Sequence, residues 1–339
     1  MADSTLASRA VNFLLSRSPV QAAGRRIVAR LDPAMLQSLW PSPQDHDAEP
    51  LDDLLAQWLQ TDLVVVDVGA RFGVVERWRR FAPHVRVVGF EPDEEECRQL
   101  SVREGGGGTV SFVPAALGPR SGTATLYLTQ VPACSSLYRP VEGLSRQRPE
   151  LACTALVGTT TVPVTTLDEW LAGSDHDHVD VVKLDTQGSE LGVLEGGVRA
   201  LRQVRLLEVE VEFNEIYERQ PLFGDVDRFL REKGFVLWRL RQLVHYGLED
   251  VAPGALSPEE SLHDDSRPHR GGQLFWGHAY FVRKELAFPG DQPHEWQQAV
   301  RDAVAFSAFG FTDLALSTLR RARAQAPAGC RADLRRLLP

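Results

Sequence analysis

The sequence predicts an α/β fold built around a mainly parallel sheet, and three stretches of the chain support this prediction. Leu63 to Val66 is a short apolar, β-branched run between polar residues, which is typical of a buried parallel strand. A glycine turn, a helical stretch and a second apolar run, Arg86 to Phe90, follow it. A further apolar run, Val179 to Leu184, is also followed by a polar turn and a helical stretch. Strands that alternate with helices in this way indicate a sheet covered by helices.

Length, charge and cysteine content exclude several other classes. The 339 residues suffice for one large domain or two modest ones, and the net charge of −9 argues against a nucleic-acid partner. The four cysteines are widely spread without a CxxC pair or zinc-ligand spacing, so we expect reduced thiols in a cytoplasmic protein. No apolar run reaches the length of a membrane span, and residues 1–30 lack the apolar core of a signal peptide.

The chain divides into three predicted regions. Residues 1–60 form a helical extension that ends in the amphipathic stretch Leu51 to Leu59. Residues 61–286 form the sheet domain, and residues 287–339 form a C-terminal pair of amphipathic helices around Gly310. The terminal helices are expected either to pack on the sheet domain or to join two copies of the chain in a homodimer. Residues 247–273, rich in Pro, Gly, Asp and His, are expected to form a long surface loop.

The remaining elements of the sheet domain follow in order. We expect further strands at Val110–Val113, Leu206–Phe213, Phe235–Leu240 and Ala279–Val282, and helices at Val74–Phe81, Glu94–Leu100, Leu191–Leu201 and Val226–Lys233. Residues 117–165 are expected to be an insertion of turns and short strands. Another helix begins after Thr166, a predicted N-cap with which Glu169 would complete a capping box.

The turn after the first strand has the composition of a cofactor cradle. Ligands of open α/β sheets bind beyond the carboxyl ends of the strands, where glycines let the backbone approach a ligand closely. Here the turn begins with an acid, and another acid ends the second strand, where it can hold a ribose diol. The predicted cofactor-binding residues are Asp67, Gly69, Ala70, Arg71, Gly73, Glu91, Pro92, Ala115 and Asp185.

The acid at the start of this turn favours one cofactor over another. The dinucleotide fingerprint G-x-G-x-x-G is not present, and the carboxylate of Asp67 would repel a pyrophosphate. The same carboxylate can pair with the ammonium group of S-adenosylmethionine, which has a ribose and no phosphate. The turn therefore favours S-adenosylmethionine over NAD, and Ala115 is a small residue beside which the adenine can lie.

The predicted strand Leu206–Phe213 has an unusual alternation. Glu208, Glu210 and Glu212 occupy one face of it, although a central parallel strand is usually apolar throughout. Burying three carboxylates is costly unless they are paired or hydrated. This face is therefore expected either to border a polar cavity or to lie on a solvated edge of the sheet.

Five segments in a fixed order, over about residues 62–240, resemble the FkbM family of S-adenosylmethionine-dependent methyltransferases. They are VVVDVGARFG, GFEPDEEECRQL, VPVTTLDEW, VDVVKLDTQGSELGVLEGG and EVEVEFNEIYERQPLFGDVDRFLREKGF. The resemblance implies a Rossmann-like, seven-stranded class I methyltransferase fold and O-methylation of a sugar, glycan or polyketide-type hydroxyl. Asp67, Gly69 and Gly73 would then face the methionine part of the donor, and Glu91 its ribose. Arg71 departs from the family, whose members usually have Asn there.

Methyl transfer to a hydroxyl also requires a base. Asp185, at the end of a predicted strand, is the favoured candidate, and its alternative role is a helix N-cap. Glu212 and His245 are the other predicted catalytic residues. Asp185, Glu212 and Asn214 together offer an oxygen set suited to magnesium, although a metal-free mechanism is the default expectation.

Two other functions compete with this interpretation. An NAD-dependent oxidoreductase or epimerase would use the same kind of sheet but a different glycine pattern. A non-catalytic scaffold would keep the fold and bind partners through its terminal helices, and the departure at Arg71 is the observation that favours it.

Overall fold

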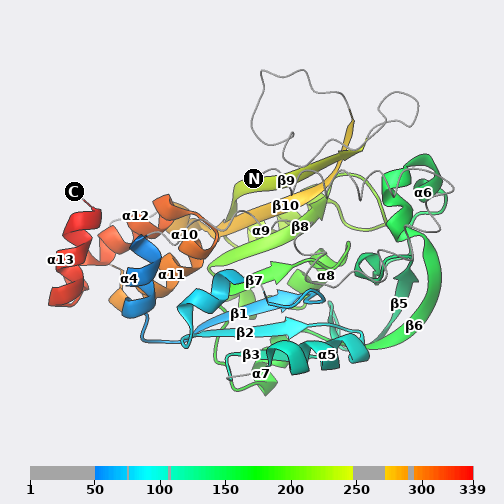
Figure 1. Cartoon of the computed structure of the whole chain (residues 1–339). Coiled ribbons are helices and arrows are strands. Elements are labelled where there is room, and N and C mark those ends of the chain that lie inside the picture. The colour runs from blue at the N-terminus through cyan, green and yellow to red at the C-terminus, as the bar shows by residue number, and fades with distance from the viewer. Residues whose placement is uncertain (1–49, 75, 106–107, 247–271, 289–293, 339) are drawn as a thin grey trace, which may run out of the picture.

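A sheet of seven strands forms the centre of the computed structural model, which describes residues 50–74, 76–105, 108–246, 272–288 and 294–338 (Figure 1). The strands are β1 (Leu63–Val68), β2 (Val85–Phe90), β3 (Val110–Val113), β7 (Val181–Leu184), β8 (Leu206–Glu212), β9 (Phe235–Tyr246) and β10 (Gln273–Arg283). They lie in the order β3-β2-β1-β7-β8-β10-β9, and β10 is antiparallel to both of its neighbours. The other neighbours are parallel, which confirms the predicted α/β class.

One face of the sheet is covered by helices from both ends of the described chain. The helices α4 (Pro50–Trp58), α11 (Trp296–Ala308) and α12 (Thr312–Ala322) share one hydrophobic cluster with β1, β7, β8 and β10. Val65, Val181 and Leu206 are the sheet residues at its centre, all almost fully buried. The terminal helices therefore pack on the sheet, which was one of the two expected arrangements.

The opposite face is covered by helices from the middle of the chain. The helices α7 (Leu167–Gly173), α8 (Glu190–Glu195) and α9 (Phe223–Glu232) pack with alternate residues of the same strands. Val66, Val182 and Leu207 point to this side, while their chain neighbours point to the other.

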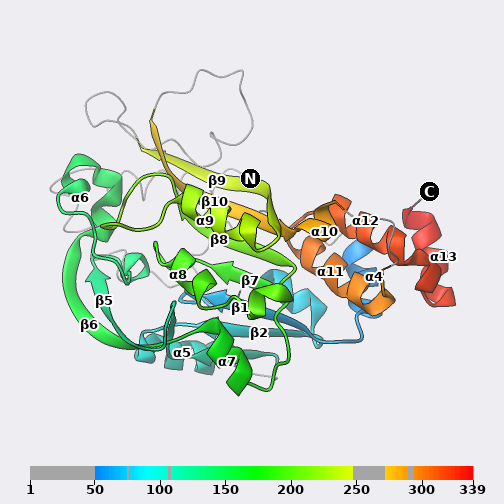
Figure 2. The same cartoon turned by 180° about the vertical axis from the view of Figure 1, so that it is seen from behind.

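A second, three-stranded sheet lies beyond the carboxyl ends of the parallel strands (Figures 1 and 2). It contains β4 (Ala116–Leu117), β5 (Gly122–Thr129) and β6 (Leu156–Thr165), with short helical turns between β5 and β6: η2 (Pro132–Cys134), α6 (Leu144–Gln147) and η3 (Pro149–Thr154). It accounts for the predicted insertion at 117–165. In both views α11 and α12 lie at the opposite end of the molecule.

Several elements differ from the prediction in length or type. The stretch expected as a helix over Val74–Phe81 is the 3-10 helix η1 (Glu76–Phe81), and α8 ends at Glu195, before the short turn η4 (Ala200–Arg202). The helix α5 (Glu94–Glu104) begins at the N-cap Asp93, whose side chain accepts a hydrogen bond from the Glu96 amide (3.2 Å). Three short elements were not predicted: α10 (Lys284–Ala287), η5 (Arg323–Gln325) and α13 (Ala328–Leu337).

The predicted cap of α7 is half confirmed. The Thr166 hydroxyl accepts a hydrogen bond from the Glu169 amide (3.0 Å), as an N-cap should. In a capping box the Glu169 carboxylate would accept a hydrogen bond from the Thr166 amide. Here Ser121 Oγ accepts from that amide (3.2 Å) and is itself bonded to the Glu169 carboxylate.

Two predicted regions lie outside the described residues: the helical extension before residue 50 and most of the loop at 247–273. Within the described part of the chain, no helix has both the length and the apolar character needed to cross a membrane.

Candidate functional site

The turn after β1 is held against the ends of β2 and β7. The amides of Gly69 and Ala70 both donate to the Phe90 carbonyl (3.0 Å each), and the Gly73 amide closes the turn onto the Ala70 carbonyl (2.8 Å). Gly69 has a φ of +82°, and a Cβ on it would lie 2.0 Å from the Asp185 carbonyl oxygen. Glycine is therefore required at position 69 both by conformation and by the close approach of the loop after β7.

Asp67 and Lys183 form a buried ion pair across β1 and β7. Lys183 Nζ lies 3.0 Å from Asp67 Oδ1 and 3.8 Å from Asp185 Oδ2. Burial lowers the pKa of Lys183, but Asp67, Asp185 and Glu208 outweigh it, so the pKa lies above its ordinary value and the amine is charged. The sequence predicted that Asp67 pairs with the ammonium group of the donor. In the structure Asp67 already pairs with the ammonium group of Lys183.

Arg71 and Glu91 face each other where the ribose site was predicted. Arg71 Nη1 lies 3.6 Å from Glu91 Oε1, and Nη2 lies 3.6 Å from Asp93 Oδ2 and 3.4 Å from Glu96 Oε2. Burial raises the pKa of Glu91 to about 7, although the Asp93 amide and Arg71 act in the opposite direction. The departure of Arg71 from the family pattern therefore adds a cation beside the acid that was predicted to bind the donor.

The other predicted cradle residues lie at the same edge of the sheet. Pro92 comes two residues after the end of β2, and Ala115 comes two residues after β3, where it is buried. The Ala115 amide donates to the Val113 carbonyl (2.9 Å), which turns the chain back toward the second sheet.

Asp185 follows β7 and borders the cradle. Its amide donates to the Val68 carbonyl (3.0 Å), and its side chain keeps 31% of its surface exposed. Burial acts to raise the pKa of Asp185, but Lys183 and His278 outweigh it and hold the pKa below its ordinary value. Asp185 is therefore an ionised, accessible carboxylate at the carboxyl edge of the sheet.

Glu208, Glu210 and Glu212 of β8 lie on one face of the sheet, here called the polar face, and all three are buried. The alternative of a solvated edge was therefore wrong. Their strand lies between β7 and β10, and each side chain is at most 7% exposed. Glu208 accepts from the Tyr280 hydroxyl (2.9 Å), and it has a lowered pKa because Arg77, His278 and Lys183 outweigh the effect of burial. Burial and neighbouring acids raise the pKa of Glu210 and Glu212 well above their ordinary value.

Gln187 ties the acids together and was not predicted as a site residue. Its Nε2 donates to Glu210 Oε2 (2.6 Å) and Asp185 Oδ1 (3.2 Å), and its Oε1 lies 3.0 Å from the Tyr217 hydroxyl. Gln187 has a φ of +58°, uncommon for a residue with a Cβ. The backbone bend after β7 thus turns the Gln187 amide toward the base candidate. Its position two residues after Asp185 was the only hint of this role in the sequence.

Arg77 and His278 complete the polar face and were also missed. Arg77 Nη1 lies 3.6 Å from Glu208 Oε2, and its guanidinium lies over the Phe309 ring, in the turn between α11 and α12. His278 pairs with Glu210 in the ladder of β10 and β8, and burial lowers its pKa. The register of β10 on β8 places His278, whereas Arg77 reaches Glu208 from η1, and neither placement can be read from a single segment of sequence.

Two predicted residues are not brought to this centre. His245 lies on β9, three strands from β7 in the sheet order, a separation of about 14 Å at the usual strand spacing. The amide oxygen of Asn214 accepts from Gln273 (2.7 Å), and its nitrogen donates to the Leu274 carbonyl (2.6 Å). Among the described residues, no group of three or more His, Cys, Asp or Glu is arranged to hold a metal ion. The magnesium set of Asp185, Glu212 and Asn214 stays a prediction, and the side-chain amide of Asn214 is bonded to Leu274 and Gln273.

The sheet order and the position of the cradle define the class of protein. If the seven strands are numbered 1 to 7 along the chain, their order in the sheet is 3-2-1-4-5-7-6, and strand 7 (β10) is the antiparallel one. The cradle lies at the carboxyl ends of strands 1 and 2 (β1 and β2). This is a class I S-adenosylmethionine-dependent methyltransferase.

The family follows from comparison with known proteins. The model of the methyltransferase FkbM domain matches residues 67–237, half of the chain, so the chain belongs to the FkbM methyltransferase family. The 2-O-methyltransferase NoeI of Sinorhizobium fredii is 25% identical over 175 residues, 49% of this chain and 70% of NoeI. The hexuronic acid methyltransferase AglP of Haloferax volcanii is 23% identical over 231 residues, 66% of this chain and 90% of AglP.

Solved structures also align with the chain, at low sequence identity. Magnesium protoporphyrin IX methyltransferase from Synechocystis, solved with bound S-adenosylmethionine, aligns with a TM-score of 0.30 and 12% identity, over 75% of this chain and 99% of that one. The family match identifies the chain as a methyltransferase rather than an NAD-dependent oxidoreductase or epimerase, and it favours an enzyme over a non-catalytic scaffold.

Proposed function

We propose that this methyltransferase transfers the methyl group of S-adenosylmethionine to a hydroxyl of a sugar or glycan. The single observation that carries the proposal is Asp185, an ionised and accessible carboxylate that borders the cradle at the end of β7. The choice of a sugar is supported by two relatives, whose names describe a 2-O-methyltransferase and a hexuronic acid methyltransferase.

The residues of the cradle suit the donor. Gly69 lets the loop that carries Asp185 approach the turn closely, and Glu91 is a buried carboxylate with hydrogen-bonding capacity for a ribose diol. We assign the methionine side of the donor to Asp67, Gly69, Ala70, Arg71 and Gly73, the ribose to Glu91, and the adenine to the neighbourhood of Pro92 and Ala115. Lys183, already paired with Asp67, would share that carboxylate with the donor's ammonium.

Asp185 acts as the base in this proposal. When bound, S-adenosylmethionine supplies an electrophilic methyl group, so the protein has to position the acceptor and take its proton. Asp185 accepts the hydroxyl proton at a carboxylate oxygen, while Gln187 holds the carboxylate through a hydrogen bond to Oδ1 (3.2 Å). Glu212, with its raised pKa, is assigned a hydrogen-bonding role toward the acceptor, and His245 a place in the outer wall of the acceptor site.

Calorimetric titration with S-adenosylhomocysteine tests the donor site, with NAD titrated alongside. We expect saturable binding of S-adenosylhomocysteine and none of NAD, and the reverse result would contradict the proposal. The acceptor is tested by incubation with S-adenosylmethionine and a panel of free and glycan-linked sugars. A methyl ether on a sugar oxygen supports the proposal, and methylation confined to nitrogen or carbon acceptors contradicts it.

For the setting of the reaction, we propose a cytoplasmic enzyme without a nucleic-acid partner. The described cysteines are all free thiols, as in a reducing compartment, and the chain carries a net charge of −9. A homodimer through the terminal helices stays a prediction, and light scattering of the purified protein measures it.

A further inference from the structure

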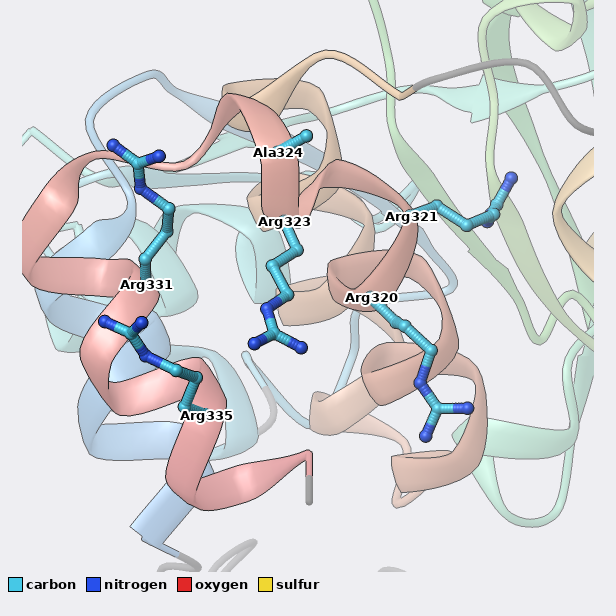
Figure 3. A pocket seen from close by; sticks show the side chains of 6 residues that line it. All are labelled: Arg320, Arg321, Arg323, Ala324, Arg331 and Arg335. Carbon is cyan, nitrogen blue, oxygen red and sulfur yellow. The ribbon is translucent and has the colours of Figure 1, made fainter.

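A hollow on the C-terminal helices is lined almost entirely by arginine (Figure 3). It has a volume of about 430 Å³, and its lining residues are Arg320, Arg321, Arg323, Ala324, Arg331 and Arg335. They come from the end of α12, from η5 and from α13. Residues 320–336 contain six arginines and one aspartate, a local charge of +5 in a chain of net charge −9.

The positive charge of the hollow is not neutralised within the described part of the chain. None of its five arginines has an ion-pair partner there, whereas the adjacent Arg336 lies 3.7 Å from Asp333. Arg331 and Arg335 are one helical turn apart on α13, so their like charges repel each other. Gathering such charges without acids costs folding free energy, which an anion bound in the hollow would offset.

The lining indicates which kind of anion fits. Guanidinium groups present planar forks of N–H donors that match phosphate oxygens. The hollow has no aromatic residue on which a base can stack, which single-stranded nucleic acid would require. Large exposed apolar side chains, which usually anchor a protein at a membrane surface, lie elsewhere among the described residues: Phe72, Val102, Leu156, Val157 and Phe288. The lining therefore favours a phosphate-type anion held by charge and by guanidinium hydrogen bonds.

We propose that this arginine hollow binds a compact anion with two or more linked phosphate groups, such as a pyrophosphate ester. Its size suits a small molecule rather than a flat surface. The hollow and the donor cradle lie at opposite ends of the molecule, the former beside α12 and α13 and the latter facing β5 and β6 (Figures 1 and 2). The arginine hollow is therefore separate from the donor cradle.

Four of the five arginines are suitable for substitution. Figure 3 shows the guanidinium of Arg321 directed away from those of Arg331 and Arg335, and its Nε and Nη2 atoms are buried without a hydrogen-bond partner in the described structure. Arg320, Arg323, Arg331 and Arg335 are all exposed, so their removal should leave the fold intact.

The test is calorimetric titration of the full chain with inorganic pyrophosphate near physiological ionic strength. We expect saturable binding that weakens at least ~10-fold in the triple variant Arg323→Gln, Arg331→Gln, Arg335→Gln, because each lost guanidinium removes a charge-assisted hydrogen bond. The control variant Arg98→Gln, Arg228→Gln, Arg231→Gln removes the same charge from exposed positions elsewhere and should bind as the unaltered chain does.

Two further probes distinguish the possible sources of phosphate. Vesicles with phosphatidylglycerol are compared with neutral phosphatidylcholine vesicles, and a single-stranded RNA oligomer is titrated in parallel. Binding to vesicles or RNA without binding to pyrophosphate would overturn the proposal, as would equal weakening in both triple variants. No binding of pyrophosphate to the unaltered chain would overturn it too. Because the readout is pyrophosphate binding, failure here leaves the proposed methyl transfer untouched.

Discussion

Lys183 Nζ lies 3.0 Å from Asp67 Oδ1, and this ion pair joins the two strands that carry the predicted donor and base residues. Asp67 belongs to β1 and Lys183 to β7, paired directly opposite each other in the sheet. Lys183 also lies 3.8 Å from Asp185, so one cation holds carboxylates from both sides of the candidate site.

Lys183→Met is expected to destabilise the protein by about 3–5 kcal/mol, because it leaves Asp67 buried without its cation. Thermal unfolding measures the loss. The loss should be smaller at pH 5 than at pH 8, since an unpaired buried carboxylate is protonated more readily at low pH. Lys284→Met, at an exposed position, is the control and should change the unfolding free energy by less than about 0.5 kcal/mol. Equal stability of both variants would contradict the structural role of the pair.

Donor binding is expected to depend on pH near neutrality. Burial raises the pKa of Glu91 to about 7, and a ribose diol donates to the ionised carboxylate. Affinity for S-adenosylhomocysteine should therefore increase as the pH rises from 6 to 8 and become constant above that. Calorimetry across this range measures it, and in Glu91→Gln the dependence should disappear. If the variant kept the same pH profile, another group would be responsible.

At pH 8.5, where Glu91 is ionised with or without its neighbour, Arg71→Asn is expected to strengthen donor binding several-fold. Near pH 7 the loss of the cation also raises the pKa of Glu91, which offsets this gain. The substitution removes a cation that lies 3.6 Å from Glu91 and restores the residue common in the family. The ribose hydroxyls then no longer compete with a guanidinium for the carboxylate. Arg98→Asn, which removes an exposed arginine bonded to Glu95, is the matched control and should have no effect. Weaker donor binding in Arg71→Asn would instead show that the arginine contacts the donor directly.

Asp185→Asn is expected to retain donor binding and to lose turnover by about 10²–10⁴-fold, the usual contribution of a general base. Both quantities are measured on the same preparation, by titration with S-adenosylhomocysteine and by methyl transfer to the acceptor found. Gln187→Ala should lower turnover less, since it only releases the carboxylate from its hydrogen bond. Unchanged turnover in Asp185→Asn would remove it as the base.

Gly69→Ala is expected to abolish donor binding or destabilise the fold. Its φ of +82° is unfavourable for alanine by about 1–2 kcal/mol, and the new methyl would lie 2.0 Å from the Asp185 carbonyl oxygen. Gly224→Ala adds the same methyl in open space on α9 and should be neutral or mildly stabilising. Titration and thermal unfolding of the two variants provide the comparison.

Short apolar, β-branched runs predicted the strands of the sheet well, because burying such runs is what stabilises a central strand. The run at Val110–Val113 became β3 with the same bounds, and Thr166 caps α7 as predicted. The strand Phe235–Leu240 proved longer, because β9 continues through an irregular stretch in which Gln242 has a φ of +52°. The helix α13 was missed, since Pro327 marks the beginning of a helix as readily as an end.

The candidate site was predicted less completely, for a different reason. Asp67 and Asp185 each follow an apolar run in the sequence. Their position after a predicted strand was enough to identify them as candidate site residues. Gln187 and His278 reach the polar face through a positive φ and through the register of β10 on β8, both of which depend on the assembled sheet. His245 lies on β9, at the edge of the sheet, and a polar residue near the end of a strand is close to the base candidate only if the two strands are neighbours.

The turn between α11 and α12 has a consequence for the boundary of the catalytic unit. Phe309 and Phe311 lie against Tyr280, and the Phe309 carbonyl accepts a hydrogen bond from Arg241 (3.0 Å). The family match ends at residue 237, yet half of the hydrophobic core comes from segments outside it. A shortened gene product that kept only the shared family segment would expose one whole side of its sheet. The segments outside the family match are therefore also part of what allows this chain to fold.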